Sequence, residues 1–260
     1  MLNPIDHRII TITKNNIDNY DLFCQKSKKK SEGYQNKLTY VKEYLDHGLT
    51  LKILYVKEKD KFTSRGFIEY IPGEYNWRGI IAPNYLVIHC LWVVGKYKNH
   101  GFGSKLLTEC LQDAKNTNGV VVMTTVETWL PHNNIFIKNG FSKIASGPNH
   151  TELYVLKNKS QSSDPTFTKP DISSLKGMKG MHIFISNQCP YILGMTNHIK
   201  KFCKEHKILA TIVPVTSCEQ AQQGFHPYGT FYYSLDDTIL DYQLNTKKVH
   251  DHLVHHGIIK

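Results

Sequence analysis

The fold that this sequence predicts depends most on one stretch, Val93-Val94-Gly95-Lys96-Tyr97-Lys98-Asn99-His100-Gly101-Phe102-Gly103-Ser104-Lys105-Leu106-Leu107. Residues 85–93, which lead into it, form an apolar run that predicts a buried strand. Residues 104–111, at its end, repeat apolar side chains at helical spacing. The stretch is therefore a basic, glycine-containing loop that joins a strand to a helix.

Such a loop favours the binding of a phosphate group. The first amides of a helix lack partners within the helix, and the helix dipole adds partial positive charge at that end. Gly101 and Gly103 allow close approach of backbone to an anion, and Lys96, Lys98 and Lys105 add charge around it. The alternative is an ordinary corner with glycines chosen for the turn. Spacing alone does not separate the two, because short glycine motifs are weak signals.

A wider pattern around the loop resembles the central motif of the Gcn5-related N-acetyltransferase (GNAT) family. It is carried here by Leu91, Val93, Tyr97, Lys98, Gly101, Gly103, Leu106 and Leu107. Where the family has Arg/Gln-x-x-Gly-x-Gly/Ala, this chain has Lys98 in first place. A second motif, Phe136-Ile137-Lys138-Asn139-Gly140-Phe141, is similar to the family's Tyr-x-Lys-x-Gly-Phe. The resemblance covers roughly residues 1–157.

The resemblance implies that acetyl-CoA is bound as co-substrate. The pyrophosphate of acetyl-CoA would lie on the loop amides, formed here by Lys98, Asn99, His100, Gly101, Phe102, Gly103 and Ser104. The backbone at Leu91 and Val93 would hydrogen-bond the pantetheine. In the family the strands that match residues 85–93 and 119–125 splay apart, and the arm of the coenzyme enters the gap.

The groups that move protons are less clear. Many family members use a tyrosine acid where this chain has Phe136, and histone-type members use a glutamate base where it has Val87. Acetyl transfer to an amine still requires the amine to lose a proton and the departing thiolate to gain one. The candidate catalytic residues near the expected cleft are Glu69, Cys90 and Glu127, with His89 as a further alternative.

Glu69 and Cys90 differ in how well an ordinary structural role would explain them. Glu69 is expensive to bury unpaired, which favours a role as base or as a carboxylate that orients the substrate. Cys90 is also consistent with a simple core residue. His89 and Cys90 are neighbours on a strand, so both face the cleft only if the strand contains a bulge. We expect His89 to be a buried histidine with its hydrogen bonds satisfied.

A second, smaller unit follows a polar linker. Residues 158–180 are rich in Ser, Pro and Gly, and residues 181–260 predict a βαβαββα order that resembles the thioredoxin fold. Cys189 matches the reactive thiol of that fold, and a helix N-terminus there predicts a lowered pKa. Pro227 matches its cis-proline. Position 192 is Ile, so a two-cysteine redox cycle within the motif is excluded. GNAT domains with this tail resemble the YoaP-like acetyltransferases.

The predicted fold class is α/β: a mixed GNAT sheet with flanking helices, followed by the thioredoxin-like unit. The domain boundaries are 1–157 for the acetyl-CoA-binding domain, 158–180 for the linker and 181–260 for the YoaP-like domain. Before the central loop we expect a strand at 9–13 and two helices within 15–48, broken near residues 31–33. A hairpin of strands 49–56 and 65–71 follows.

Composition limits the class of protein. The chain has 260 residues, is 40% hydrophobic and 21% charged, and has a formal net charge of +10. No apolar run approaches a membrane span, and the six cysteines form no metal-binding Cys-x-x-Cys pair. We therefore expect a cytoplasmic protein with no membrane partner and no metal. The lysines are spread along the chain, which disfavours nucleic acid as a partner.

The function predicted from the sequence is acetyl transfer from acetyl-CoA to an amine by direct attack. The acceptor would be a small molecule or a peptide, and no residue identifies it. The alternative is a non-enzymatic acyl-CoA-binding or thiol-sensing module, because the usual tyrosine and glutamate are replaced. Cys189 is a possible reactive thiol under either interpretation.

Overall fold

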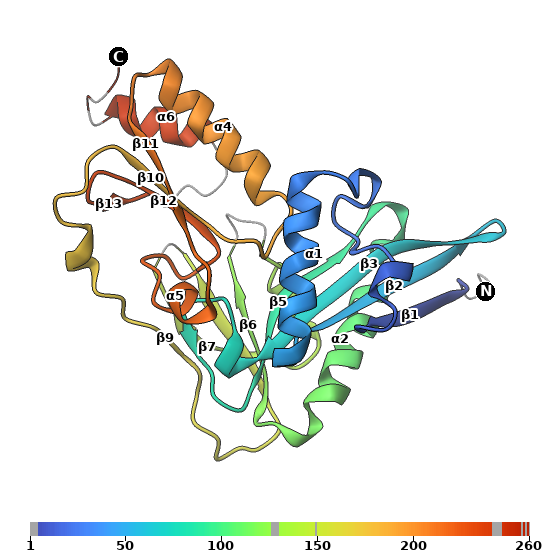
Figure 1. The fold of residues 1–260 in the computed structure, drawn as a ribbon. Coiled ribbons are helices and arrows are strands. Elements are labelled where there is room, and N and C mark those ends of the chain that lie inside the picture. Colours follow the sequence, from blue (N-terminus) through green and yellow to red (C-terminus); the bar gives the residue numbers. More distant parts are fainter. Residues whose placement is uncertain are drawn as a thin grey trace.

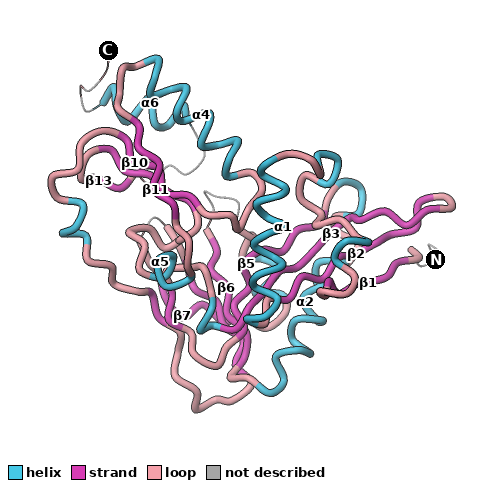
Figure 2. The backbone as a smooth tube through the Cα atoms, viewed as in Figure 1, coloured by secondary structure: helices cyan, strands magenta, loops and turns pink. Residues whose placement is uncertain are grey.

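The computed structural model describes residues 5–125, 130–148, 150–240, 246–255, 257 and 259. These residues form a large mixed sheet and a smaller sheet, with helices packed against both (Figures 1 and 2). Within the described part of the chain, no helix is both long enough and apolar enough to cross a bilayer.

The larger sheet has seven strands in the order β1-β2-β3-β5-β6-β8-β7. In chain order these strands are β1 (His7–Ile12), β2 (Thr50–Glu58), β3 (Lys61–Pro72), β5 (Leu86–Val93), β6 (Gly119–Thr124), β7 (Ser142–Ser146) and β8 (Glu152–Lys157). The β5–β6 pair is parallel, and the other neighbours are antiparallel. The predicted mixed α/β sheet with flanking helices is therefore confirmed.

Helices cover both faces of this sheet. Helix α1 (Glu32–Tyr44) packs its tyrosines on Leu51 and Ile53 of β2, whereas α2 (Phe102–Asp113) packs on Leu54 and Val56 of the same strand. Because side chains alternate along a strand, the two helices lie on opposite faces. Figure 1 shows α1 in front of the sheet and α2 behind its lower part. The short helix α3 (Asn134–Lys138) joins the core on the α2 side.

Strand β5 changes its pairing halfway along its length. A bulge shifts its register with β3, so that Glu69 pairs with Cys90 but Tyr70 pairs with Ile88. His89 is the extra residue, and the bulge turns both His89 and Cys90 toward the cavity described below. Pairing with β6 also ends at Ile88, although β5 continues to Val93. The two central strands thus separate just before the predicted loop.

Residues 181–260 build the smaller sheet and its helices. The elements are β10 (Met181–Ile185), α4 (Ile192–Glu205), β11 (Ala210–Pro214), α5 (Cys218–Gln222), β12 (Phe231–Leu235), β13 (Thr238–Ile239) and α6 (Thr246–His255). The sheet order is β11-β10-β12-β13, with β10 parallel to β11 and antiparallel to β12. Helix α4 begins at Ile192, so Cys189 precedes its first turn. No described peptide bond is cis, including the one before Pro227.

The two sheets share apolar cores. One core joins Val87 and Val121 of the larger sheet to Ile183 and Phe231 of the smaller one. Gly33 in the first turn of α1 lies close to the segment before α4, because a Cβ there would lie 2.4 Å from the Pro190 carbonyl oxygen. The segment predicted as a linker also takes part, since β9 (Thr166–Phe167) pairs with β4 (Ile80–Ile81).

The first of the two helices expected within residues 15–48 is absent, and this prediction is wrong. Residues 17–19 and 26–28 form short 3₁₀ turns, and only α1 is a regular helix. Phe23 and Gln25 have positive φ angles, which a helix does not contain. Ser31 caps α1 by accepting a hydrogen bond from the Tyr34 amide, so the helix begins where the sequence predicted a break.

Candidate active site

The loop between β5 and α2 has the open backbone that an anion site requires. Gly101 caps α2 with φ +75°, and a Cβ at that position would meet nothing within 4 Å. Within the described part of the chain, the amides of residues 99–104 form no hydrogen bond with a backbone carbonyl in a turn or loop. They also have no partner within α2, because the first amides of a helix lack acceptors in that helix. After Lys98, the next amide that is bonded is that of Lys105, which donates to the Gly101 carbonyl at 3.0 Å.

The strand before this loop offers a free edge. Leu91 pairs with Ile68 of β3 on one side, and on the β6 side no described strand pairs with β5 beyond Ile88. Val93 likewise pairs with Gly66 of β3 and with no described strand on the β6 side. The loop and the free strand edge are therefore continuous, and both expose unpaired backbone.

The second motif lies beside the loop. Asn139, just after α3, donates a 3.1 Å hydrogen bond to the Ser104 hydroxyl. Phe136 is fully buried and packs edge-on against Phe141, 5.4 Å between ring centroids. Val87 is equally buried, in the core shared by the two sheets. Neither side chain can transfer a proton, so the acid and base of other members have no counterpart at these positions.

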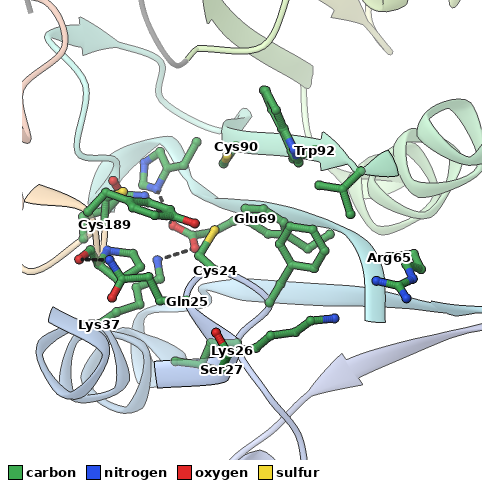
Figure 3. A pocket seen from close by; sticks show the side chains of 18 of the residues that line it. Cys24, Gln25, Lys26, Ser27, Lys37, Arg65, Glu69, Cys90, Trp92 and Cys189 are labelled. Atoms are coloured by element: carbon green, nitrogen blue, oxygen red, sulfur yellow. Dashed lines mark hydrogen bonds and ion pairs between the residues drawn. The ribbon is translucent and has the colours of Figure 1, made fainter. Parts of the chain in front are cut away.

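A cavity of about 650 Å³ lies on the α1 side of β3 and β5. Figure 3 shows it enclosed by side chains from several parts of the chain. Its walls come from the loop before α1, from α1, β3 and β5, and from the segment before α4. The lining residues are Leu22, Phe23, Cys24, Gln25, Lys26, Ser27, Lys37, Arg65, Phe67, Glu69, Arg78, His89, Cys90, Trp92, Val94, Gln188, Cys189, Pro190, Tyr191 and Tyr228.

Glu69 is the buried carboxylate of this cavity. Its side chain has no exposed surface and forms an ion pair with Lys37, which is itself 4% exposed. The other oxygen accepts a 2.7 Å hydrogen bond from Gln188. Burial alone would raise the pKa of Glu69, but the charge of Lys37 and the nearby His89 lower it to about 2. Glu69 is therefore an anion at neutral pH and a weak base.

His89 is neutral in this setting. Its Nε2 atom accepts a 3.0 Å hydrogen bond from the Trp77 amide, which leaves the proton on Nδ1, 3.5 Å from a Glu69 oxygen. Burial lowers the pKa of His89 to about 4. The histidine helps to close the cavity and carries no charge at neutral pH.

Three thiols enter the cavity from different segments: Cys24 from the loop before α1, Cys90 from β5 and Cys189 from the loop before α4 (Figure 3). Burial raises the pKa of all three, that of Cys90 to about 12. The lowered pKa predicted for Cys189 is therefore wrong, because burial outweighs any effect of the helix terminus. Among the described residues, no His, Cys, Asp and Glu side chains group to hold a metal ion.

Sequence reasoning found some of the cavity and missed the rest. Glu69 and Cys90 both line it, whereas Glu127 lies outside the described residues. Lys37 and Arg78 were missed, because no local pattern in the sequence distinguishes them from the other cations of the chain. Gln188 was missed because its partner lies 119 residues away.

A family comparison includes the loop. Residues 20–141 match the model of the Acetyltransferase (GNAT) family. The chain therefore contains a GNAT acetyltransferase domain, and this class of enzyme transfers the acetyl group of the co-substrate acetyl-CoA to an acceptor. Both sequence motifs and the whole of the loop between β5 and α2 fall inside the match.

One relative resembles nearly the whole chain. It is the protein named "Uncharacterized N-acetyltransferase YoaP" of Bacillus subtilis strain 168, 29% identical over 240 residues, which are 90% of this chain and 93% of that protein. The similarity therefore extends beyond the acetyltransferase domain into the smaller sheet.

Solved structures of acetyltransferases resemble part of the chain. One is a GNAT-family acetyltransferase from Staphylococcus aureus Mu50, with a TM-score of 0.40 and 19% identity over 59% of this chain and 100% of that one. Another is the PaiA N-acetyltransferase of Thermoplasma acidophilum in complex with coenzyme A, with a TM-score of 0.39 and 16% identity over 59% and 99%.

Proposed function

We propose that the protein transfers the acetyl group of acetyl-CoA to an amine bound in the cavity beside β5. The observation that carries this proposal is the continuity of three features along one strand. The unpaired amides of residues 99–104 suit the pyrophosphate, and the free edge at Leu91 and Val93 suits the pantetheine. The cavity lies against the same strand at Cys90 and Trp92.

In the proposed reaction the free-base amine attacks the thioester carbonyl directly. The C–N bond forms, the C–S bond breaks, and the electron pair leaves with the coenzyme thiolate. The nitrogen then loses its second proton to water or to the thiolate. The enzyme contributes chiefly by holding the two reactants together, which replaces a bimolecular encounter by a local one.

The candidate catalytic residues take limited roles in this scheme. We assign Glu69 to orientation rather than to proton removal, because a carboxylate with a pKa near 2 is a poor base. Cys90 keeps its proton at neutral pH and can donate an S–H hydrogen bond to the departing thiolate. Glu127 remains a prediction. Lys98, Asn99, His100, Phe102, Gly103 and Ser104 belong with Gly101 in the proposed coenzyme site.

We also propose that residues 181–260 are a thioredoxin-like unit that forms one wall of the acceptor site. Its strand order, with β10 parallel to β11 and antiparallel to β12, supports this proposal. The segment 188–191 then serves as cavity wall rather than as a redox centre. The boundaries 1–157, 158–180 and 181–260, and the cytoplasmic location, stay predictions.

One observation favours a second candidate function, the sensing of thiols or acyl-CoA without turnover. Cys24, Cys90 and Cys189 meet in one cavity although they come from three segments. Their raised pKa values disfavour it, because the thiolate is the reactive form of cysteine. Acetyl transfer therefore remains the first proposal.

The test is turnover of acetyl-CoA with a broad panel of amines. Free coenzyme is separated and measured by chromatography, since the protein's own thiols would react with a colorimetric reagent. We expect stoichiometric coenzyme release and an acetylated amine detected by mass spectrometry. The triple variant Cys24→Ser, Cys90→Ser, Cys189→Ser separates the two candidates, because sensing requires the thiols. Binding of acetyl-CoA with no acetylated product from any amine would contradict the proposed function.

A further inference from the structure

Arg78 is a buried cation that lines the acceptor cavity and forms no ion pair with any described residue. Its guanidinium donates to the Tyr228 carbonyl at 2.9 Å and the Thr230 hydroxyl at 3.0 Å, both through Nη1. Nη2 donates to the His89 carbonyl at 2.9 Å. Nε is buried and has no hydrogen-bond partner.

The unused donors of Arg78 form a defined pair. A guanidinium carries five N–H groups, and the three hydrogen bonds above leave two, one on Nε and one on Nη2. The edge of a guanidinium that carries Nε and Nη2 matches the two oxygens of a carboxylate, which is the usual bidentate partner of arginine. A buried donor left without a partner is unfavourable. An acidic group on a ligand would supply what the protein does not.

The other charges of the cavity do not neutralise Arg78. Lys37 is paired with Glu69, and Arg65 is paired with Glu58 outside the cavity wall. The carboxylate of Glu69 is therefore already engaged. With Lys26 also among the lining residues, the cavity carries more positive than negative charge. Such a field favours an anionic group on the ligand and repels a polycation.

We propose that the acceptor amine also carries a carboxylate, which binds Arg78 while the amine reaches the thioester at β5. This inference rests on the proposed acetyl transfer and narrows its substrate class to amino acids and similar small amino-carboxylates. Arg78 donates to the carbonyl of His89, the residue before Cys90, so one small molecule can contact both Arg78 and Cys90. A cavity of about 650 Å³ is of the size that small-molecule sites have.

The first test compares matched substrates on the unchanged, full-length protein. Each amino acid is paired with its own carboxamide, and polyamines are included; initial rates are followed through coenzyme release. We expect the best amino acid to exceed its amide by at least about tenfold in kcat/KM, because the amide lacks the charge. Amides or polyamines that are as good as the acids would overturn the inference while leaving acetyl transfer intact. No product from any amine would overturn the proposed function, and this inference with it.

The second test uses Arg78→Gln and reads the ratio of kcat/KM for acid over amide. Arg78 also joins β5 to the smaller sheet, so the variant is expected to lose stability and some activity with both substrates. A purely structural role lowers both rates together, whereas the proposed role lowers the ratio toward one. The control is Arg65→Gln, which removes a second cavity-lining guanidinium that already has a carboxylate partner. An unchanged ratio in Arg78→Gln, or an equal loss in Arg65→Gln, would overturn the inference.

Discussion

The proposed coenzyme loop and the proposed acceptor cavity meet at β5 but are built in opposite ways. The loop is a single continuous segment, residues 94–104, with unpaired backbone amides at residues 99–104 and exposed lysines. The cavity gathers side chains from segments as far apart as Leu22 and Tyr228, and the charges of Lys37, Glu69 and Arg78 within it are buried. One site is made of backbone and the other of side chains.

This difference shows what each site demands of the rest of the protein. A backbone anion site needs only a strand that stops pairing and a helix that begins, and most side chains are acceptable there. A buried ion pair needs all its partners at once, because a single missing partner leaves an uncompensated charge. The cavity is therefore coupled to stability, whereas the loop is not.

Removal of Lys37 should have the largest effect. Lys37→Met leaves the Glu69 carboxylate buried without its cation, and we expect a loss of about 3 to 5 kcal/mol in the free energy of unfolding. The measurement is urea denaturation followed by fluorescence. Lys42→Met on the same helix is the control, because its partner Asp18 is exposed and the expected loss is below about 1 kcal/mol.

The double variant Lys37→Met, Glu69→Gln sharpens that result. With the charge also removed, the stability of the double variant should recover most of the loss, since replacing a whole buried pair is often nearly neutral. Equal losses in Lys37→Met and Lys42→Met would mean that the cavity charges are not coupled to folding. The contrast between the two sites would then be wrong.

A charge in the loop should weaken coenzyme binding without destabilising the fold. Ser104→Glu places a carboxylate at the start of α2, where helices favour acidic residues. We expect the Kd for acetyl-CoA, measured by calorimetry, to rise at least about tenfold through repulsion of the pyrophosphate, with an unchanged melting temperature. Ser104→Gln is the uncharged control of matched size. Gly101→Glu should act in the same direction but adds strain at φ +75°. Equal Kd values for acetyl-CoA in Ser104→Glu and Ser104→Gln would mean that the pyrophosphate does not bind at this loop.

The smallest expected effect is on the pH dependence of activity, because Glu69 and His89 in the cavity should not titrate in the working range. The pKa of Glu69 is about 2 and that of His89 about 4, so neither changes its charge between about pH 6 and pH 9. The rate constant kcat/KM should rise with pH as the free-base amine increases, and level off at the pKa of the amine. Profiles of kcat/KM against pH, measured with two amines of different pKa, should be shifted along the pH axis by the difference between those pKa values. An inflection near pH 6 to 7 that is common to both amines would reveal a basic group in the enzyme.

Much of the fold was predictable because its signals are local. The apolar run before Val94, the glycines after it and the hairpin of β2 and β3 each lie within a short segment. The helix expected before Ser31 failed because contacts with the rest of the protein hold Phe23 and Gln25 at positive φ; Gln25, for example, donates to the Pro190 carbonyl. The separation of β5 from β6 was expected only from the family resemblance. The bulge at His89 was named only as the condition under which His89 and Cys90 could both face the cleft.

The sequence by itself predicted the mixed sheet, through the family resemblance, and the proposed anion-binding loop, because the motifs for both lie in the order of neighbouring residues along the chain. Only the tertiary structure decided the state of the catalytic candidates. Glu69 is an anion because Lys37 and Gln188, 32 and 119 residues away, are folded against it. Arg78 retains free donors because the carbonyls and hydroxyl that surround it are too few to use them all. Burial, charge and hydrogen bonding are properties of a folded neighbourhood, and they set what each side chain can do.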